Sequence, residues 1–173
     1  PLKRFLDGAE RLKSHLGPIL YQCPPTFHRT PENVERLDSF LDLLPGRPRH
    51  TFEFRHDSWY VDQTYEALRK HNVALCIQDM RGTHCPLVTT ADFTYVRFHG
   101  GEQGYAGNYG DTALENWAER VRGLGRDGAK TAWLFFNNDG DAHAIANALT
   151  IRRMLTGDDS RRGAETEYYE RAG

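Results

Sequence analysis

The segment YVRFHG at residues 95–100 has the pattern of a β-strand whose end carries charged and polar groups. Side chains alternate across a strand, so Arg97 and His99 are expected on one face and the apolar residues on the other. The segment TFEFRH at residues 51–56 is built the same way, with Glu53 and Arg55 sharing a face. Charged groups gathered at a strand end are not needed for a purely structural strand. The two segments therefore guide the interpretation of the whole chain.

Segments typical of strands and helices alternate along the 173 residues. The hydrophobic pattern predicts five strands, at residues 19–23, 51–55, 73–77, 93–99 and 131–136. Helices are predicted at about residues 2–16, 31–44, 63–71, 111–124 and 141–155. Strands that alternate with helices are typical of parallel βαβ connections, so an α/β fold is expected.

Capping residues mark the predicted helix starts. Thr30 followed by Pro31 is a typical helix N-terminus, with a side-chain acceptor and then a residue that needs no hydrogen bond. The other predicted caps are Asp62, Asp111 or Thr112 (with Glu115 completing a capping box) and Asp141.

The polar strand faces distinguish between two α/β architectures. Strands of a doubly wound sheet are covered on both faces and are apolar throughout. Strands with one polar face instead suit the mouth of a closed or partly closed barrel. We therefore expect a TIM-barrel type of fold, in which active sites lie at the carboxyl ends of the strands. Five hydrogen-bonding side chains stand at the predicted strand ends: Gln22, Arg55, Asp79, His99 and Asn137.

Composition sets broad limits on the class of protein. The length predicts one domain, and a net charge of -2 gives no overall signature of nucleic-acid or membrane binding. The three cysteines have no CxxC spacing, which favours a reducing compartment over a disulfide framework. No signal peptide or long apolar run is seen, so a soluble, cytoplasmic protein without a membrane partner is expected.

Several segments resemble the DUF72 (YecE-like) family of bacterial TIM-barrel proteins. They are residues 16–25, 53–59, 95–100 and 135–138, together with Asn147-Ala148. The resemblance covers nearly all of residues 1–155 and implies family strands four to eight, because the family's opening strand–helix units are not found. It therefore implies a truncated barrel with about five parallel strands. Residues 156–173 are expected to form a polar tail.

A truncated barrel would leave the strands at residues 19–23 and 131–136 with unpaired edges. We expect the chain either to form a homodimer through those edges or to be the remnant of a longer protein. The family has no settled activity, so the resemblance implies a fold more than a function.

The charged strand faces supply the candidate catalytic and anion-binding groups. Arg55 and Arg97 are predicted to clamp an anion, and His99 to act as acid or base because its ordinary pKa lies near neutrality. The alternative for Arg97 and His99 is an inward polar network whose members only satisfy one another within the barrel. Glu53 is predicted either to form a simple salt bridge with Arg55 or to orient it toward a substrate oxyanion. Asp79 is interpreted as a base, a metal ligand or a turn former.

Further candidates lie in the loops that follow the strands. His56 and Trp59 follow the second strand, and Trp59 is predicted to stack on a ligand or to pack the loop. Asn137 is predicted to bind ligand or to cap the last loop, and Gln22 is interpreted mainly as structural. The glycine-rich loop at residues 100–110 is a predicted lid carrying Tyr105, Asn108 and Tyr109.

The sequence does not match the known motifs for phosphate or dinucleotide binding or for a nucleophilic serine. The loop at residues 100–110 lacks both the P-loop lysine and the dinucleotide spacing, and the sequence has no GxSxG elbow. A site built from His99, Asp79 and Glu53 is conceivable, but no zinc spacing supports it, so no metal and no named cofactor are predicted. We expect an enzyme acting on a small phosphate- or carboxylate-bearing substrate. The alternative is a module that binds a ligand or nucleic-acid phosphates without chemistry.

Overall fold

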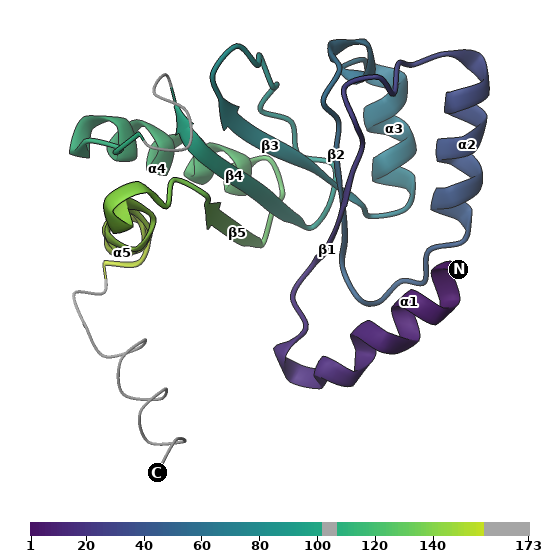
Figure 1. Cartoon of the computed structure of the whole chain (residues 1–173), viewed down its shortest axis with the longest axis horizontal. Coiled ribbons are helices and arrows are strands. Elements are labelled where there is room, and N and C mark those ends of the chain that lie inside the picture. Colours follow the sequence, from purple (N-terminus) through teal and green to yellow (C-terminus); the bar gives the residue numbers. More distant parts are fainter. Residues whose placement is uncertain (102–106, 158–173) are drawn as a thin grey trace.

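The computed structural model describes residues 1–101 and 107–157. Within that range one parallel sheet contains five strands in the order β1-β2-β3-β4-β5, so each strand pairs with its neighbour in the sequence. The strands are β1 (Ile19–Gln22), β2 (His50–Glu53), β3 (Ala74–Met80), β4 (Phe93–Gly101) and β5 (Thr131–Phe136). The sheet is curved, and β1 and β5 form its two edges (Figure 1).

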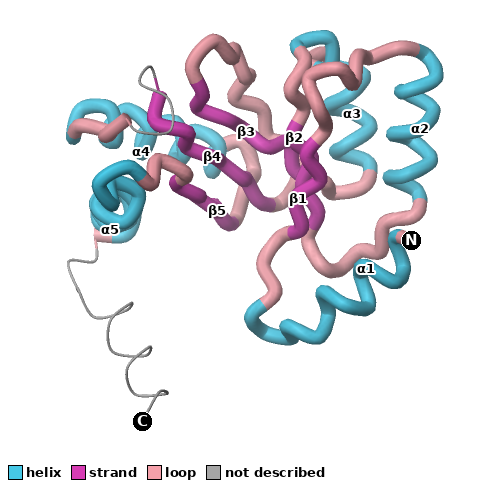
Figure 2. The backbone as a smooth tube through the Cα atoms, in the orientation of Figure 1, coloured by secondary structure: helices cyan, strands magenta, loops and turns pink. Residues whose placement is uncertain are grey.

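Helices follow β1, β2, β4 and β5 and cover the outer side of the sheet, whereas a segment without a helix joins β3 to β4. The helices are α1 (Leu2–Ala9), α2 (Pro31–Asp42), α3 (Asp62–Lys70), α4 (Asp111–Arg126) and α5 (His143–Thr156), with 3₁₀ turns η1 (Glu10–His15), η2 (Asp57–Trp59) and η4 (Gly140–Ala142). Helices α2 and α3 lie beside β1 and β2, whereas α4 and α5 lie beside β4 and β5 (Figure 2). None of the helices in the described ranges is both long and apolar enough to cross a membrane.

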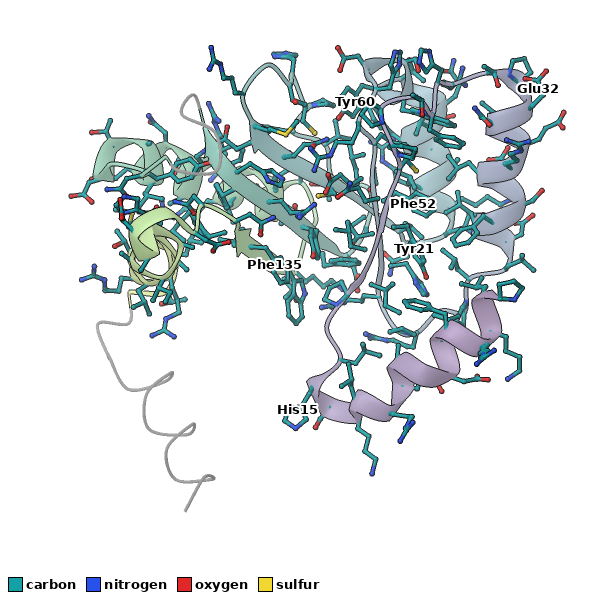
Figure 3. The ribbon with its side chains drawn as sticks, in the orientation of Figure 1. His15, Tyr21, Glu32, Phe52, Tyr60 and Phe135 are labelled. Atoms are coloured by element: carbon teal, nitrogen blue, oxygen red, sulfur yellow. The ribbon has the colours of Figure 1, made fainter. Side chains whose placement is uncertain are left out.

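The outer face of the sheet carries two hydrophobic clusters. The first packs β2 and β3 against α2 and α3, with Phe52, Phe54 and Leu68 among its buried members. Tyr21 and Phe52 project from β1 and β2 toward α2, and their rings are 5.2 Å apart (Figure 3). The second cluster packs β4 against α4 and α5 around Phe98. The alternation of apolar residues along each strand accounts for this face.

The concave face is apolar at the amino ends of the strands. Cys76 and Tyr95 are buried there, with Leu20 of β1 and Trp133 of β5 packed against them. Trp133 also reaches across the opening between the sheet edges, because a Cβ added to Gly17 would lie 3.3 Å from its ring. The carboxyl ends of the same strands carry the polar groups of the concave face.

The predicted elements are all present, but several boundaries were wrong. The third strand continues from the predicted end at Ile77 to Met80, so Asp79 lies within a strand and is not a turn former. The predicted first helix is divided into α1 and the 3₁₀ turn η1, within which Lys13 has a φ of 50°. Thr30 is confirmed as the N-cap of α2, since its hydroxyl accepts a hydrogen bond from the backbone N–H of Asn33 at 3.3 Å.

The other predicted caps were wrong. Val61 precedes α3 and Gly110 precedes α4, and neither makes a side-chain capping hydrogen bond. Asp62 and Asp111 are instead the first residues of their helices, where a carboxylate still interacts favourably with the helix dipole. The last helix begins at His143, because Asp141 adopts a left-handed conformation with a φ of 51°.

Candidate functional site

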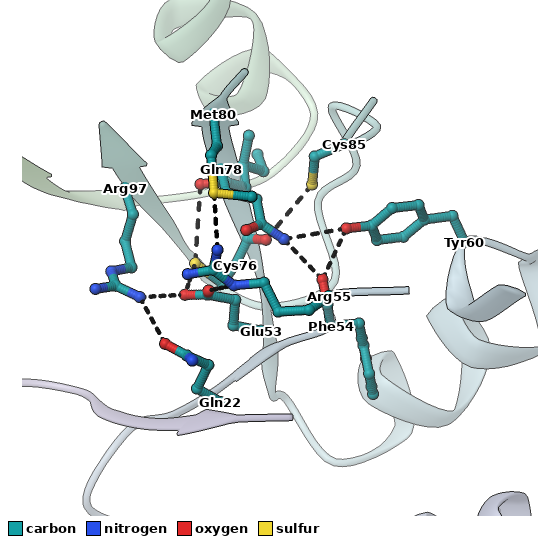
Figure 4. Close-up of polar contacts among 11 residues, drawn as sticks. Gln22, Glu53, Phe54, Arg55, Tyr60, Cys76, Gln78, Met80, Cys85 and Arg97 are labelled. Atoms are coloured by element: carbon teal, nitrogen blue, oxygen red, sulfur yellow. Dashed lines mark hydrogen bonds and ion pairs between the residues drawn. The ribbon is translucent and has the colours of Figure 1, made fainter. Parts of the chain in front are cut away.

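Glu53 lies at the centre of the polar cluster on the concave face. Its side chain is fully buried, with 0% exposed, and it forms ion pairs with Arg55 and Arg97 (Figure 4). The distance from Arg97 Nη1 to Glu53 Oε2 is 2.5 Å. Arg55 is two residues from Glu53, and Arg97 comes from β4, so strand alternation brings all three to one face. Glu53 therefore forms a salt bridge with Arg55 and also fixes the orientation of both guanidinium groups.

Arg97 is held on two sides. Its Nη1 also donates a hydrogen bond to Gln22 Oε1 at 3.1 Å, which links β4 to the far edge strand β1. Burial lowers the pKa of Arg97, but the hydrogen bond and the charge of Glu53 outweigh that effect and raise it overall. Arg97 therefore remains a cation, and Gln22 acts in positioning it.

A second layer of contacts supports Arg55 and its strand. Arg55 Nη1 donates to the sulfur of Met80 at 2.8 Å. Gln78 Nε2 donates to the Phe54 carbonyl at 2.7 Å, and the Tyr60 hydroxyl donates to the same carbonyl at 2.9 Å. Of these supporting residues, the sequence-based prediction missed Gln78, Met80 and Tyr60. Alternation through a strand extended to residue 80 would have placed Gln78 and Met80 on this face.

The charges of the cluster do not cancel. Two arginines face one carboxylate, and the side chains of Arg55 and Arg97 are only 11% and 16% exposed. In the described part of the chain, the hydrogen bonds of Arg97 both come from Nη1. Guanidinium groups present several donors in a planar fork that matches carboxylate and phosphate oxygens. The arrangement thus combines one excess positive charge with donors suited to an oxyanion.

His99 follows Arg97 on the same face of β4 and is 1% exposed. Its pKa is lowered from the ordinary 6.5, first by burial and then by the positive charges of Arg97 and Arg55. Glu53 and Asp79 act in the opposite direction but do not reverse the shift. The imidazole is therefore neutral at pH 7 and able to accept a proton.

Asp79 lies on the opposite face of β3 from this cluster. Its Oδ2 accepts a hydrogen bond from Trp117 Nε1 of α4 at 3.1 Å. It lines a cavity of about 600 Å³ at the carboxyl ends of β3 and β4. Asp79 and Glu53 both act electrostatically on His99, but the described residues contain no group of three His, Cys, Asp or Glu able to hold a metal ion.

Two aromatic candidates from the sequence have packing roles. Trp59 is 1% exposed, stacks on Phe54 with ring centroids 4.7 Å apart, and donates from Nε1 to the Phe27 carbonyl at 2.6 Å. Of the two predicted roles, the structure shows loop packing. Tyr109 is also buried, and its hydroxyl accepts a hydrogen bond from the backbone N–H of Gly100 at 3.1 Å.

The remaining candidates lie around the rim of the sheet. His56 Nδ1 accepts from the backbone N–H of Ser58, and its ring stacks on His28 with centroids 3.8 Å apart. Asn137 continues β5, with its backbone N–H bonded to the Phe98 carbonyl at 2.8 Å. Its neighbour Asn138 has a structural role, because its buried side-chain amide donates a hydrogen bond to the Gly107 carbonyl. Tyr105 of the predicted lid lies outside the described residues.

These features define a parallel α/β protein with a charged cluster at the carboxyl ends of its strands. The model of the family described as "Protein of unknown function DUF72" matches residues 1–168. The chain therefore belongs to the DUF72 family, and the resemblance seen in its segments is confirmed.

Solved structures of DUF72 proteins share this fold. A DUF72 family protein of Thermotoga maritima is 32% identical with a TM-score of 0.79, and the match covers 89% of this chain and 64% of that chain. A DUF72 family protein of Enterococcus faecalis is 22% identical with a TM-score of 0.79, covering 92% of this chain and 66% of that one. The chain thus spans slightly less than two thirds of these relatives. The expected α/β fold, with five parallel strands forming part of a barrel, is confirmed. No curated protein matches the chain.

Proposed function

We propose that the concave face binds a small phosphate- or carboxylate-bearing ligand through Arg55 and Arg97, and that His99 exchanges a proton with it. The observation that carries the proposal is the pair of guanidinium groups held around one fully buried carboxylate. The ion pairs fix both arginines in advance, so little side-chain entropy would be lost when an oxyanion binds.

Position and protonation support a catalytic role for His99. It lies two residues beyond Arg97 on the same strand face, at the end of the sheet where sites of barrel enzymes are found. Its lowered pKa keeps it neutral near pH 7, the form required of a general base. The reaction class would be proton transfer on an anionic substrate, with the arginines stabilising negative charge.

The anion-binding part is tested by titrating inorganic phosphate, and separately acetate, into the protein at constant ionic strength. Calorimetry and thermal unfolding would both be followed, because a ligand that binds the folded state raises the unfolding temperature. We expect Arg97→Gln to weaken binding at least about tenfold, since it removes a charge-assisted contact. Arg97→Lys keeps the charge beside Glu53 and should retain part of the affinity.

The matched control is Arg126→Gln, which removes an exposed arginine paired with Glu119 at the end of α4. It should bind both anions like the unmodified chain. If neither anion binds, or if Arg126→Gln weakens binding as much as Arg97→Gln, the anion site is disproved.

The proton-transfer part is tested with His99→Gln and a panel of phosphorylated and carboxylated metabolites. An enzyme loses turnover in this variant while its affinity is largely kept. If turnover is unchanged, or if the unmodified chain converts no compound that it binds, the catalytic role is overturned. Loss of affinity in Arg55→Ala and Arg97→Ala without any turnover would indicate the non-catalytic binding module.

A further inference from the structure

A second polar site lies on the other side of β3 from the arginine cluster. The cavity at the carboxyl ends of β3 and β4 has a volume of about 600 Å³, which is the size of a small-molecule site. Its wall combines the carboxylate of Asp79 with the aromatic rings of Tyr109 and Trp117, and the exposed residues Arg81 and His84 also line it. Met80 connects the cavity with the arginine cluster, because it lines the cavity and its sulfur also accepts the N–H of Arg55.

Asp79 is held in this wall by neutral donors. Trp117 Nε1 donates to Oδ2 at 3.1 Å. Burial raises the pKa of Tyr109, and the charge of Asp79 and a hydrogen bond to it raise that pKa further. The Tyr109 hydroxyl therefore stays protonated and donates to the carboxylate. Both donors fix the position of Asp79 without neutralising its charge.

No lysine or arginine in the described ranges forms an ion pair with Asp79. The two neutral donors replace part of the hydration that the half-buried carboxylate loses, but neither of them balances its negative charge. The same carboxylate faces a cavity large enough for an organic ligand. A ligand cation placed there would supply the missing charge.

The backbone beside Asp79 is irregular. The pairing of β3 with β4 shifts register between Asp79 and Met80, and Met80 pairs with Gly101. Gly100 and Gly101 have φ values of 85° and 57°, a region that favours glycine. Irregularities of this kind redirect side chains at strand ends and are common beside functional sites. Here the shift sends Asp79 toward α4 and Met80 toward Arg55.

We infer that this cavity binds a small molecule through a protonated amine seated on Asp79. An ammonium group offers three donors and one positive charge, which match the open side of the carboxylate. A bare metal ion fits less well, since the described residues provide no cluster of ligands around Asp79. The inference is independent of the arginine cluster, which binds the opposite charge on the opposite face of the strand.

The indole N–H of Trp117 provides a direct reporter, because it donates to Asp79. The chain has three tryptophans, so a ¹⁵N-labelled sample gives three indole signals. We would titrate ethanolamine and, in parallel, ethylene glycol, which has the same size but carries no charge. The expected result is a saturable shift of the Trp117 signal with ethanolamine, with the signals of Trp59 and Trp133 unchanged.

Asp79→Asn keeps an oxygen acceptor for Trp117 but removes the charge, so the ethanolamine shift should disappear while the three indole signals stay dispersed. The matched control Asp127→Asn, at the end of α4, should respond like the unmodified chain. The inference is overturned if ethanolamine leaves the Trp117 signal in place, if ethylene glycol shifts it equally, or if Asp79→Asn still responds.

Discussion

Glu53 is the acidic partner of two arginines, and its own side chain has no contact with water. In water each of these charges would be hydrated, so the folded protein replaces hydration with ion pairs. When one partner of a buried pair is removed, the other charge stays buried without compensation. The cluster is therefore sensitive to loss of its carboxylate.

We predict that Glu53→Gln destabilises the folded protein by about 3–5 kcal/mol, because it leaves two largely buried guanidinium groups without an anion. Urea unfolding followed by circular dichroism gives the free energy of unfolding. The control Glu119→Gln removes an exposed carboxylate that pairs with Arg122 and Arg126 on α4. It should leave the free energy of unfolding unchanged within error. Equal stability of Glu53→Gln and the unmodified chain would contradict the buried cluster.

His99 gives the stability a dependence on pH. In the unfolded chain its pKa is near 6.5, whereas burial and the charges of Arg97 and Arg55 lower it in the folded protein. Between the two pKa values the unfolded chain binds more protons, so the free energy of unfolding falls as the pH is lowered. The contribution of His99 is complete above about pH 6.5 and is lost as the pH falls through the folded-state pKa.

The measurement is urea unfolding at a series of pH values below and above 6.5, and His99→Gln should reduce the slope. Burial also lowers the pKa of His50, although its hydrogen bond to the Pro45 carbonyl acts in the opposite direction. The stability of His99→Gln should therefore still fall somewhat as the pH is lowered. The double variant with His50→Gln should flatten the curve further. A slope unchanged by His99→Gln would show that the imidazole titrates alike in both states.

At the scale of the element, β3 shows what the sequence could and could not predict. Its apolar residues predict a strand, and alternation on β2 and β4 correctly predicts the shared faces of Glu53 with Arg55 and of Arg97 with His99. The strand continues past Ile77 because Gln78 and Asp79 pair with Arg97 and Phe98 of β4, and their side chains bond the Phe54 carbonyl and Trp117. Those partners are distant in the sequence, so no local pattern reveals them.

The contacts of the loops also could not be predicted from the local sequence. A tryptophan in a loop is equally compatible with ligand stacking and with packing. Trp59 packs because Phe27 and Phe54 enclose its ring on two sides. The pairing of Gln22 with Arg97 also joins residues 75 positions apart, which only the sheet brings together.

The turn into β1 depends on a close approach between the two sheet edges. We predict that Gly17→Ala lowers the unfolding temperature, with a loss of about 1 kcal/mol, because its new Cβ would lie 3.3 Å from the Trp133 ring. Gly46→Ala is the matched control, since nothing lies within 4 Å of a Cβ at that position. Calorimetry of both variants gives the two unfolding temperatures to be compared. If Gly17→Ala is as stable as Gly46→Ala, Trp133 does not close this side of the sheet.

At the scale of the whole molecule, the edges of the sheet remain available for pairing. Within the described residues β1 and β5 each have one strand neighbour. Phe135 of β5 is 38% exposed, and an unpaired edge with an apolar side chain favours association. We propose that two copies of the chain associate through these edges.

Sedimentation velocity over a range of concentrations tests this proposal. We expect a concentration-dependent dimer that Phe135→Lys weakens, because a charge on the edge strand opposes pairing. Leu43→Lys is the control, since Leu43 is 68% exposed but lies after α2, away from both edges. A stable monomer at every concentration would rule out association through the edges.

The strand order has a consequence for how the protein is made. Each strand from β2 onward pairs with the one before it in the chain, so its partner has already been synthesised when the strand forms. The first hydrophobic cluster and its packing partners lie between Tyr21 and Val88, and the second is completed only by Leu155. The half built on β1, β2 and β3 can thus assemble on the ribosome while the rest is still being translated. A pause in translation once Val88 has left the ribosome would expose little of the first core to the cell's chaperones.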